Sequence, residues 1–257
     1  MDPIITNALM TFGAGFTGAA LSKAEGPGQV LDDVMTLVGF DRLHEVAEKK
    51  RAKRDQNIKD YKNSIATEIA KIPEDNIQEP PLSIVGPALE ASKFYIEEEQ
   101  LRDMFANLIA SSMDKSKNSS NHASFVEIIK QMDFVDATIL NFIFFQIPSK
   151  ILALAKLGET TENGGSIFHY ENLVGFSIQD VSTNQIASSI QNLNRLGLIT
   201  IDYMSSFTED VHYNYVEQSN EYIELSNKIN NHVGQINITR GISKITPYGI
   251  NFCKTCL

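Results

Sequence analysis

Three consecutive carboxylates are the first residues in this sequence whose chemistry invites attention. Glu97, Glu98 and Glu99 could be taken for a general acid and base pair. Consecutive residues on a helix point about 100° apart, so these side chains do not converge on one substrate atom. We therefore expect a solvated turn or an acidic patch that faces a partner.

The histidines and cysteines lack the spacing of a metal site. The five histidines are scattered: His44, His122, His169, His212 and His232. We expect His122 to fix the loop before Ser124 rather than to bind a ligand. Cys253 and Cys256 have redox-like spacing, but a redox pair lies at the start of a helix, and these lie within or after the last one. Packing is the expectation, with a redox or intermolecular metal role as the alternative.

Other motifs of catalysis are missing from the sequence. It contains no phosphate-binding loop, nucleophile elbow or two-histidine metal motif. The glycine-rich residues 12–18 lack the preceding strand of a dinucleotide site. We predict no catalytic residue, no cofactor and no metal, and therefore not an enzyme. A nuclease site assembled from distant carboxylates stays open.

Composition and charge narrow the class of protein. The 257 residues are 42% hydrophobic, enough for one large or two small cores. With 22 basic and 32 acidic residues the net charge is -10, which makes nucleic acid an unfavourable partner. The start of the chain has no signal-peptide layout, which predicts a cytoplasmic protein. Residues 3–22 are uncharged, and we favour a packed Ala/Gly-rich helix there over membrane association.

Helical patterns dominate a first predicted domain, residues 1–135. A long charged helix is expected over residues 41–72, with a solvated basic run in its middle. A proline-rich linker over residues 73–87 contains Pro80 and Pro81, and Pro87 suits the first turn of the next helix. That helix has one apolar face, formed by Leu101, Met104, Phe105, Leu108, Ile109, Ser112 and Met113.

Two further helices are indicated near the end of this domain. Ser124 and Glu127 have the spacing of a capping box, which would open a helix that contains Phe125. Asp136 is expected to be the N-cap of a very apolar helix over residues 137–147, and Pro148 ends it. So apolar a helix belongs at the centre of a core or between two domains.

The last third, residues 136–257, predicts a different architecture. Ser182 and Gln185 form a second capping box, and Gly197 suits a left-handed helix stop. Strands are expected over residues 198–203 and 242–245, followed by a terminal helix capped by Thr246. This order is typical of a winged-helix-like (α+β) domain, so we predict a mainly α protein: an N-terminal helical domain with a C-terminal winged-helix-like domain. Its second helix carries Arg195 as its one basic residue, which favours protein contact or dimerisation over DNA binding.

Three segments carry a resemblance to a known family. Residues 72–87, 95–113 and 122–131 are similar to the bacterial abortive infection alpha (Abi-alpha) family, with support from residues 193–199 and 246–253. Ala123 departs from the family pattern, where proline often follows the histidine. The first forty residues match only in being helical and rich in small residues.

The resemblance implies a role in bacterial defence against phage, in which an infected cell stops growing or dies before progeny are released. It brings no established catalytic residues. We expect a partner protein of phage or host origin, and a homo-oligomer stays open. A winged-helix transcriptional regulator and a membrane-acting effector that uses residues 3–22 are the alternatives. Candidate contact positions are Pro80, Pro81, Pro87, Glu97, Glu98, Glu99, Phe105, His122, Phe125 and Arg195.

Overall fold

The chain forms two compact units. The computed structural model describes residues 48–161, 163–229 and 235–257. Unit 1 contains the described residues up to Phe134 together with Asn251–Leu257, and unit 2 is Val135–Ile250. The last seven residues thus belong with the first part of the chain. The domain boundary expected at residue 135 stays a prediction.

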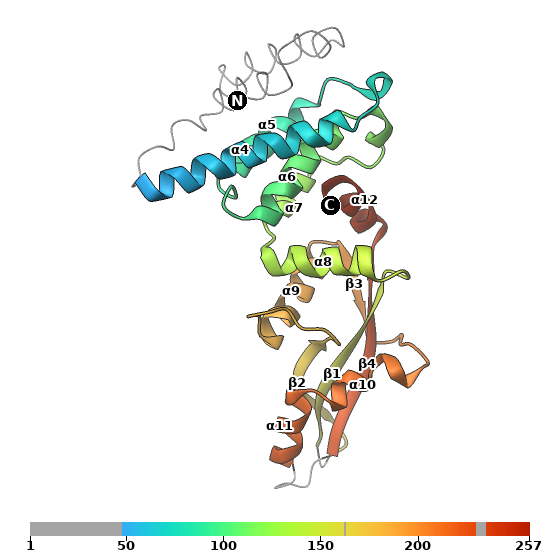
Figure 1. Ribbon diagram of the computed structural model, residues 1–257. Coiled ribbons are helices and arrows are strands. Elements are labelled where there is room, and N and C mark those ends of the chain that lie inside the picture. Colours follow the sequence, from blue (N-terminus) through green and yellow to red (C-terminus); the bar gives the residue numbers. More distant parts are fainter. Residues whose placement is uncertain (1–47, 162, 230–234) are drawn as a thin grey trace. The chain divides into compact units, whose positions relative to one another are not determined.

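Unit 1 is helical and is organised around α6 (Figure 1). Helix α6 packs against α4, α5 and α7. Every side chain of its predicted apolar face is buried, which confirms that part of the sequence reading. The elements are α4 (Glu48–Ala70), η2 (Glu74–Asn76), α5 (Leu82–Ser92), α6 (Glu99–Ser112), η3 (Lys115–Lys117), α7 (Phe125–Ile129) and the end of α12 (Pro247–Cys256).

Aromatic contacts join the terminal helix to the rest of unit 1. Phe125 on α7 and Phe252 on α12 are fully buried, and their rings meet edge to face with centroids 5.2 Å apart. Tyr95 lies 5.6 Å from the ring of Phe105. Such pairs contribute about 1 kcal/mol beyond the area they bury.

Two helix starts in unit 1 differ from the sequence expectation. Helix α5 begins directly after Pro81, so Pro87 lies inside the helix rather than in its first turn. Pro87 has no N–H for the carbonyl of Ser83, but both residues are exposed and water can take that carbonyl. The capping box at Ser124 does not form, because the backbone of Ser124 is already helical and its hydroxyl bonds His122 Nδ1 at 2.6 Å.

Unit 2 is built on a four-stranded antiparallel sheet in the order β2-β1-β4-β3. The strands are β1 (Ile151–Thr160), β2 (Ser166–Leu173), β3 (Ile199–Asp202) and β4 (Gln235–Ile245). Strand β1 pairs with β4 along its whole length, from Ile151 to Thr160. It pairs with β2 only from Ala155 onward, with a bulge in the register.

The other elements of this unit are helices, of which α9 and α11 lie along the sheet (Figure 1). They are α8 (Phe134–Gln146), α9 (Thr183–Arg195), η4 (Asp210–His212), α10 (Asn214–Glu217), α11 (Asn220–Ile229) and the start of α12. Helix α9 packs on β2 and β3, and α11 packs on β1 and β4. The core of this unit contains Ala155, Leu157, Leu173, Val216, Leu225 and Ile229.

The fold is therefore α+β, and the prediction of a mainly α protein with a winged-helix-like domain is wrong. Two strands, β1 and β2, precede α9 and form half of the sheet. Between β3 and β4 the chain forms η4, α10 and α11 instead of the expected long hairpin. The transcriptional-regulator alternative loses the winged helix on which it was based, while DNA binding itself stays an alternative.

Two of the local sequence signals in unit 2 are confirmed and a third is wrong. The capping box of Ser182 and Gln185 is present in full, and Gly197 has the predicted left-handed backbone, with φ of 74°. The N-cap role of Asp136 is wrong, because α8 begins two residues earlier. Asp136 is instead buried and accepts hydrogen bonds from the Ser189 hydroxyl and from Asn192 Nδ2, the latter at 2.7 Å.

Some expectations lie outside the described residues. These are the uncharged segment 3–22, the beginning of the long helix at 41–47, His44 and His232. The part of the long helix that is described, α4, confirms a helix there up to Ala70.

Candidate functional site

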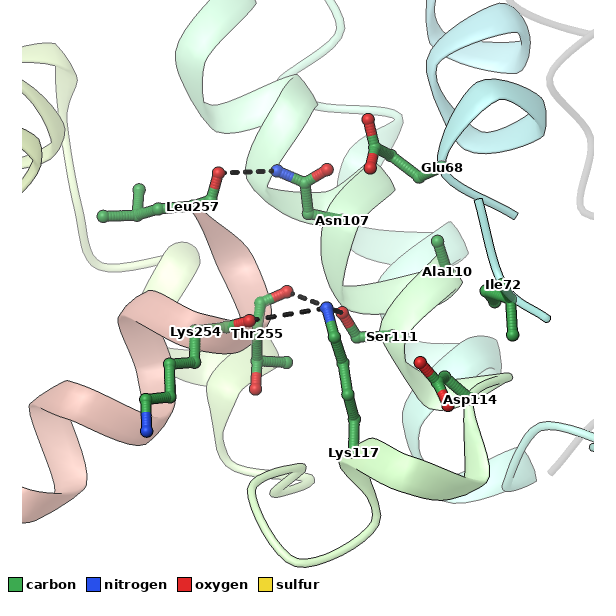
Figure 2. Close-up of a pocket in the computed structure, with 10 residues that line it drawn as sticks. All are labelled: Glu68, Ile72, Asn107, Ala110, Ser111, Asp114, Lys117, Lys254, Thr255 and Leu257. Carbon is green, nitrogen blue, oxygen red and sulfur yellow. Dashed lines mark hydrogen bonds between the residues drawn. The ribbon is translucent and has the colours of Figure 1, made fainter. Parts of the chain in front are cut away.

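A cavity of about 140 Å³ in unit 1 gathers polar side chains around the end of α12 (Figure 2). Figure 2 shows Lys117 extending between α6 and the last turn of α12. The cavity is lined by Glu68, Ile72, Asn107, Ala110, Ser111, Asp114, Lys117, Lys254, Thr255 and Leu257.

The polar groups of this cavity bind the carbonyl oxygens of the final helical turn. Lys117 Nζ donates to Ser111 Oγ at 3.0 Å and to the carbonyl of Lys254 at 3.5 Å. Ser111 Oγ donates to the Thr255 carbonyl at 3.0 Å, and Asn107 Nδ2 lies 3.2 Å from the Cys256 carbonyl. The last carbonyls of a helix have no partner within it, and a cation there interacts favourably with the helix dipole. These side chains therefore hold α12 in unit 1.

The carboxylates of the cavity are also engaged. Asp114 accepts the N–H and the hydroxyl of Ser116 at 2.9 and 2.7 Å. Glu68 forms an ion pair with Lys71 at 2.6 Å. Covalent or acid–base catalysis needs a nucleophile and a base within hydrogen-bond reach of each other. The carboxylates of this cavity instead bond side chains next to them in the sequence.

A wider polar cleft of about 490 Å³ lies between α4 and α6. Asp60, Glu68, Glu99 and Asp103 line it with Arg102. Burial raises the pKa of the Asp103 carboxyl, and the neighbouring Arg102, with Nε 3.8 Å from the carboxylate, opposes that rise. Within the described part of the chain, no three His, Cys, Asp or Glu side chains gather closely enough to hold a metal ion.

Unit 2 contains an apolar groove of about 500 Å³, and we call it the β1 groove. Its lining is Phe142, Ile147, Pro148, Ser149, Ile151, Leu152, Ala153, Gly175, Phe176, Phe207, Val211, His212 and Tyr215. The rings of Phe142 and Phe176 are 4.8 Å apart, and Phe207 stacks on His212 at 4.2 Å. Val211 is 62% exposed.

Tyr215 fixes the shape of the β1 groove. Its hydroxyl donates to the Leu173 carbonyl at 2.8 Å and lies 3.4 Å from the Ala153 carbonyl, so it bridges β1 and β2 where they separate. Burial raises the pKa of this phenol well above its ordinary value, so the hydroxyl stays a donor even in alkaline solution where an exposed tyrosine ionises. A Cβ on Gly175 would lie 2.9 Å from the Tyr215 ring, which explains glycine at that position.

The candidate contact positions from the sequence do not form one site. The fully buried Phe105 and Phe125 belong to the core of unit 1, and Pro80 is buried as well. Glu97, Glu98 and Glu99 are exposed, and of the three only Glu99 lines the polar cleft.

Pro81 precedes α5 and Pro87 lies in it, while His122 bonds Ser124. Arg195 is exposed and donates to Asn192 Oδ1 at 2.7 Å. Their part in function stays a prediction.

Sequence reasoning missed the β1 groove. Phe142 had been placed in an apolar helix, but Phe176, Val211 and Tyr215 come from separate segments with no shared spacing. The pairing of β1 with β2 and the hydrogen bonds of Tyr215 to Ala153 and Leu173 bring distant segments together here. The sequence holds no local signal for such a groove.

Two further expectations can be compared with the described residues. Both cysteines lie in α12 as buried thiols outside any disulfide, as packing cysteines do. Among helices in the described ranges, none joins the length and the apolar character that crossing a bilayer requires.

Comparison with known proteins adds the family. A search of curated proteins found no match. Among solved structures, the chain is similar to one titled as an uncharacterized protein from the hydrocarbon-degrading marine bacterium Alcanivorax borkumensis SK2. That match has 18% identity and a TM-score of 0.33, and it covers 55% of this chain and 94% of the other. A family model described as abortive infection alpha matches residues 53–256. Because this match covers most of the chain, the protein belongs to the abortive infection alpha family, which suggests a role in antiviral defence by abortive infection.

Proposed function

We propose that this protein acts in abortive infection by binding another protein, without catalysing a reaction. The observation that carries the proposal is the β1 groove, which is lined by aromatic and aliphatic side chains. Its shape is fixed by the Tyr215 hydrogen bonds before any partner arrives. Preformed apolar surfaces with a few polar groups are typical of binding sites. The partner is a phage or host protein, met in the cytoplasm.

The cavity at the end of α12 supports a structural role for its polar groups rather than catalysis. In the cavity at the end of α12, Lys117, Ser111 and Asn107 already bond backbone carbonyls of that helix. Asp114 and Glu68 bond neighbouring side chains. Groups with these structural tasks are poorly placed to give or take a proton from a substrate.

Phage plating tests the proposal. Cells that express the protein should lower phage plating, with culture survival at a low phage-to-cell ratio and collapse at a high ratio. Val211→Ser removes an exposed apolar side chain from the β1 groove and should restore plating to the level of cells without the gene. Ile223→Ser is the matched control, because Ile223 is 53% exposed on α11, away from the groove lining.

The two variants also define what would contradict the proposal. Equal protection by the Val211→Ser and wild-type proteins would remove the groove from function. Equal loss in both variants, at normal protein levels, would point to a general surface effect rather than to a specific contact.

A further inference from the structure

We propose that the occupant of the β1 groove is an extended segment of the partner protein, which adds to the open edge of β1 as a strand. This inference rests on the proposed function and deepens it, because it states the conformation and the chemistry of the bound segment. Strand addition of this kind takes affinity from backbone hydrogen bonds and specificity from alternate side chains.

The edge of β1 is open over its first half. Strand β1 pairs with β4 from Ile151 to Thr160 but with β2 only from Ala155 onward. Over residues 151–154, no strand of the described chain pairs with the other side of β1. Unpaired strand edges are templates for pairing with another chain.

The direction of the backbone groups follows from one hydrogen bond. Ile245 N–H donates to the Lys150 carbonyl at 3.3 Å, so Lys150 directs its carbonyl toward β4. In an antiparallel ladder, alternate residues turn both backbone groups to the same neighbour. Leu152 therefore faces β4 as well, whereas Ile151 and Ala153 turn theirs to the open side, where both residues line the groove.

Two of the four groups on this side already have partners. Ile151 N–H lies 3.3 Å from Ser149 Oγ, and the Ala153 carbonyl lies 3.4 Å from the Tyr215 hydroxyl. The Ile151 carbonyl and the Ala153 N–H are left for an incoming strand. Both residues are half-buried and line the groove, beside which the incoming strand would lie.

The lining and the charge define the segment further. Phe142, Phe176 and Val211 suit apolar side chains at alternate positions of a strand. Unit 2 has six basic and eleven acidic residues, a balance of -5 (6 minus 11), which favours a segment with basic flanks. The same balance makes a second copy of this chain a less favourable occupant.

A synthetic peptide tests strand addition directly. The probe is a fluorescein-labelled decapeptide that alternates valine and phenylalanine with serine and has two lysines at each end. Its binding to the full-length protein is followed by fluorescence anisotropy. The same peptide with every central amide N-methylated cannot donate backbone hydrogen bonds. We expect N-methylation to weaken binding about fivefold, because it removes the peptide N–H that would donate to the Ile151 carbonyl and keeps the peptide carbonyl that would accept the Ala153 N–H.

Protein variants locate the site. Val211→Ser should weaken peptide binding about fivefold, because it removes apolar contact area, and Ile223→Ser should leave it unchanged. Ala153→Pro removes the N–H that faces the groove and should weaken binding about fivefold, the cost of one hydrogen bond, if its circular dichroism matches that of the wild type. If Ala153→Pro does not fold, the N-methylated peptide and Val211→Ser still decide the question.

Three results would overturn the inference. They are unchanged affinity for the N-methylated peptide, equal binding by the Val211→Ser and Ile223→Ser proteins, and a dimer in solution that Val211→Ser dissociates. The last result would make a second copy the occupant. If no peptide binds but Val211→Ser still loses phage protection, strand addition fails and the proposed function stands. If Val211→Ser protects fully, the proposed function itself fails.

Discussion

Two opposing effects act on the pKa of the Asp103 carboxyl, which lies in the polar cleft of unit 1. Burial raises the pKa of its carboxyl, while Arg102 and a 3.4 Å hydrogen bond from Ser64 favour the charged form. The rise prevails, so the folded protein binds this proton more tightly than the unfolded chain does. The stabilising contribution of protonation is therefore present below the unfolded pKa and is lost as the pH rises through the folded pKa.

Asp103→Asn should remove this contribution to the pH dependence of the free energy of unfolding. The amide keeps an oxygen for Ser64 and carries no charge to desolvate. We expect the variant to gain stability relative to the wild type between about pH 4 and about pH 7, measured by urea unfolding at both. Asp60→Asn, on a half-buried residue that lines the same cleft, is the control. A stability difference between Asp103→Asn and wild type that does not change with pH would contradict the assignment.

The residue scale also shows a limit of sequence reasoning. Asp136 was read as a helix cap because aspartate before an apolar run is the usual signal. Its actual partners, Ser189 and Asn192, lie on a helix more than fifty residues later in the chain. A buried carboxylate with distant partners looks the same in sequence as an exposed cap.

At the scale of elements, the capping box of α9 is the local signal with a measurable effect. The Ser182 hydroxyl lies 3.3 Å from the Gln185 N–H, and Gln185 Oε1 accepts the Ser182 N–H at 2.9 Å. Ser182→Ala should lower the free energy of unfolding by about 1 kcal/mol, measured by urea denaturation. Ser188 on the same helix is exposed, so Ser188→Ala should change the free energy of unfolding by less than about 0.5 kcal/mol. Equal effects of the two variants would mean that the cap adds nothing.

Elements defined by neighbours in sequence were predictable, and elements defined by distant pairing were not. The capping box at Ser182, the stop at Gly197 and strand β3 depend on a few adjacent residues. Strand β1 contains alanine, lysine and glutamate, which favour helices, and its burial does not alternate because of the bulge. Its stability comes from β4, which lies far along the chain.

The same distinction governs the candidate site. The residues that sequence favoured, such as Phe105 and Phe125, are core residues, because strong apolar periodicity reports burial. The β1 groove depends on a missing pairing, namely the part of β1 that β2 leaves uncovered. The register between two strands decides how much of one strand its neighbour covers. Register depends on both strands together, so it cannot be predicted from either segment alone.

At the scale of the whole molecule, the chain passes between the two units twice. The divisions fall at residues 134/135 and 250/251, inside α8 and α12. The family match over residues 53–256 includes parts of both units and both divisions. Residues that resembled the family most specifically lie in unit 1, whereas the β1 groove lies in unit 2. The family relationship therefore extends over the groove as well.

The buried cysteines offer a measure of how firmly the chain's last residues are held in unit 1. Cys253 and Cys256 are at most 1% exposed, and burial raises the pKa of the Cys256 thiol. A protonated and covered thiol does not react, because the thiolate is the nucleophile. Iodoacetamide should therefore label the native protein slowly and the unfolded protein fast, with the extent followed by mass spectrometry.

Phe252→Ala should raise the labelling rate of the native protein by at least a hundredfold. Removing a fully buried phenylalanine costs about 3 to 5 kcal/mol, and the population of opened molecules rises accordingly. Phe145→Ala is the matched control, since Phe145 is 54% exposed on α8 and should leave the rate unchanged. Rapid labelling of the wild-type protein, at the rate of the unfolded chain, would mean that α12 leaves unit 1 readily. It would also restore the redox alternative for this cysteine pair, because both thiols would then be accessible to oxidants.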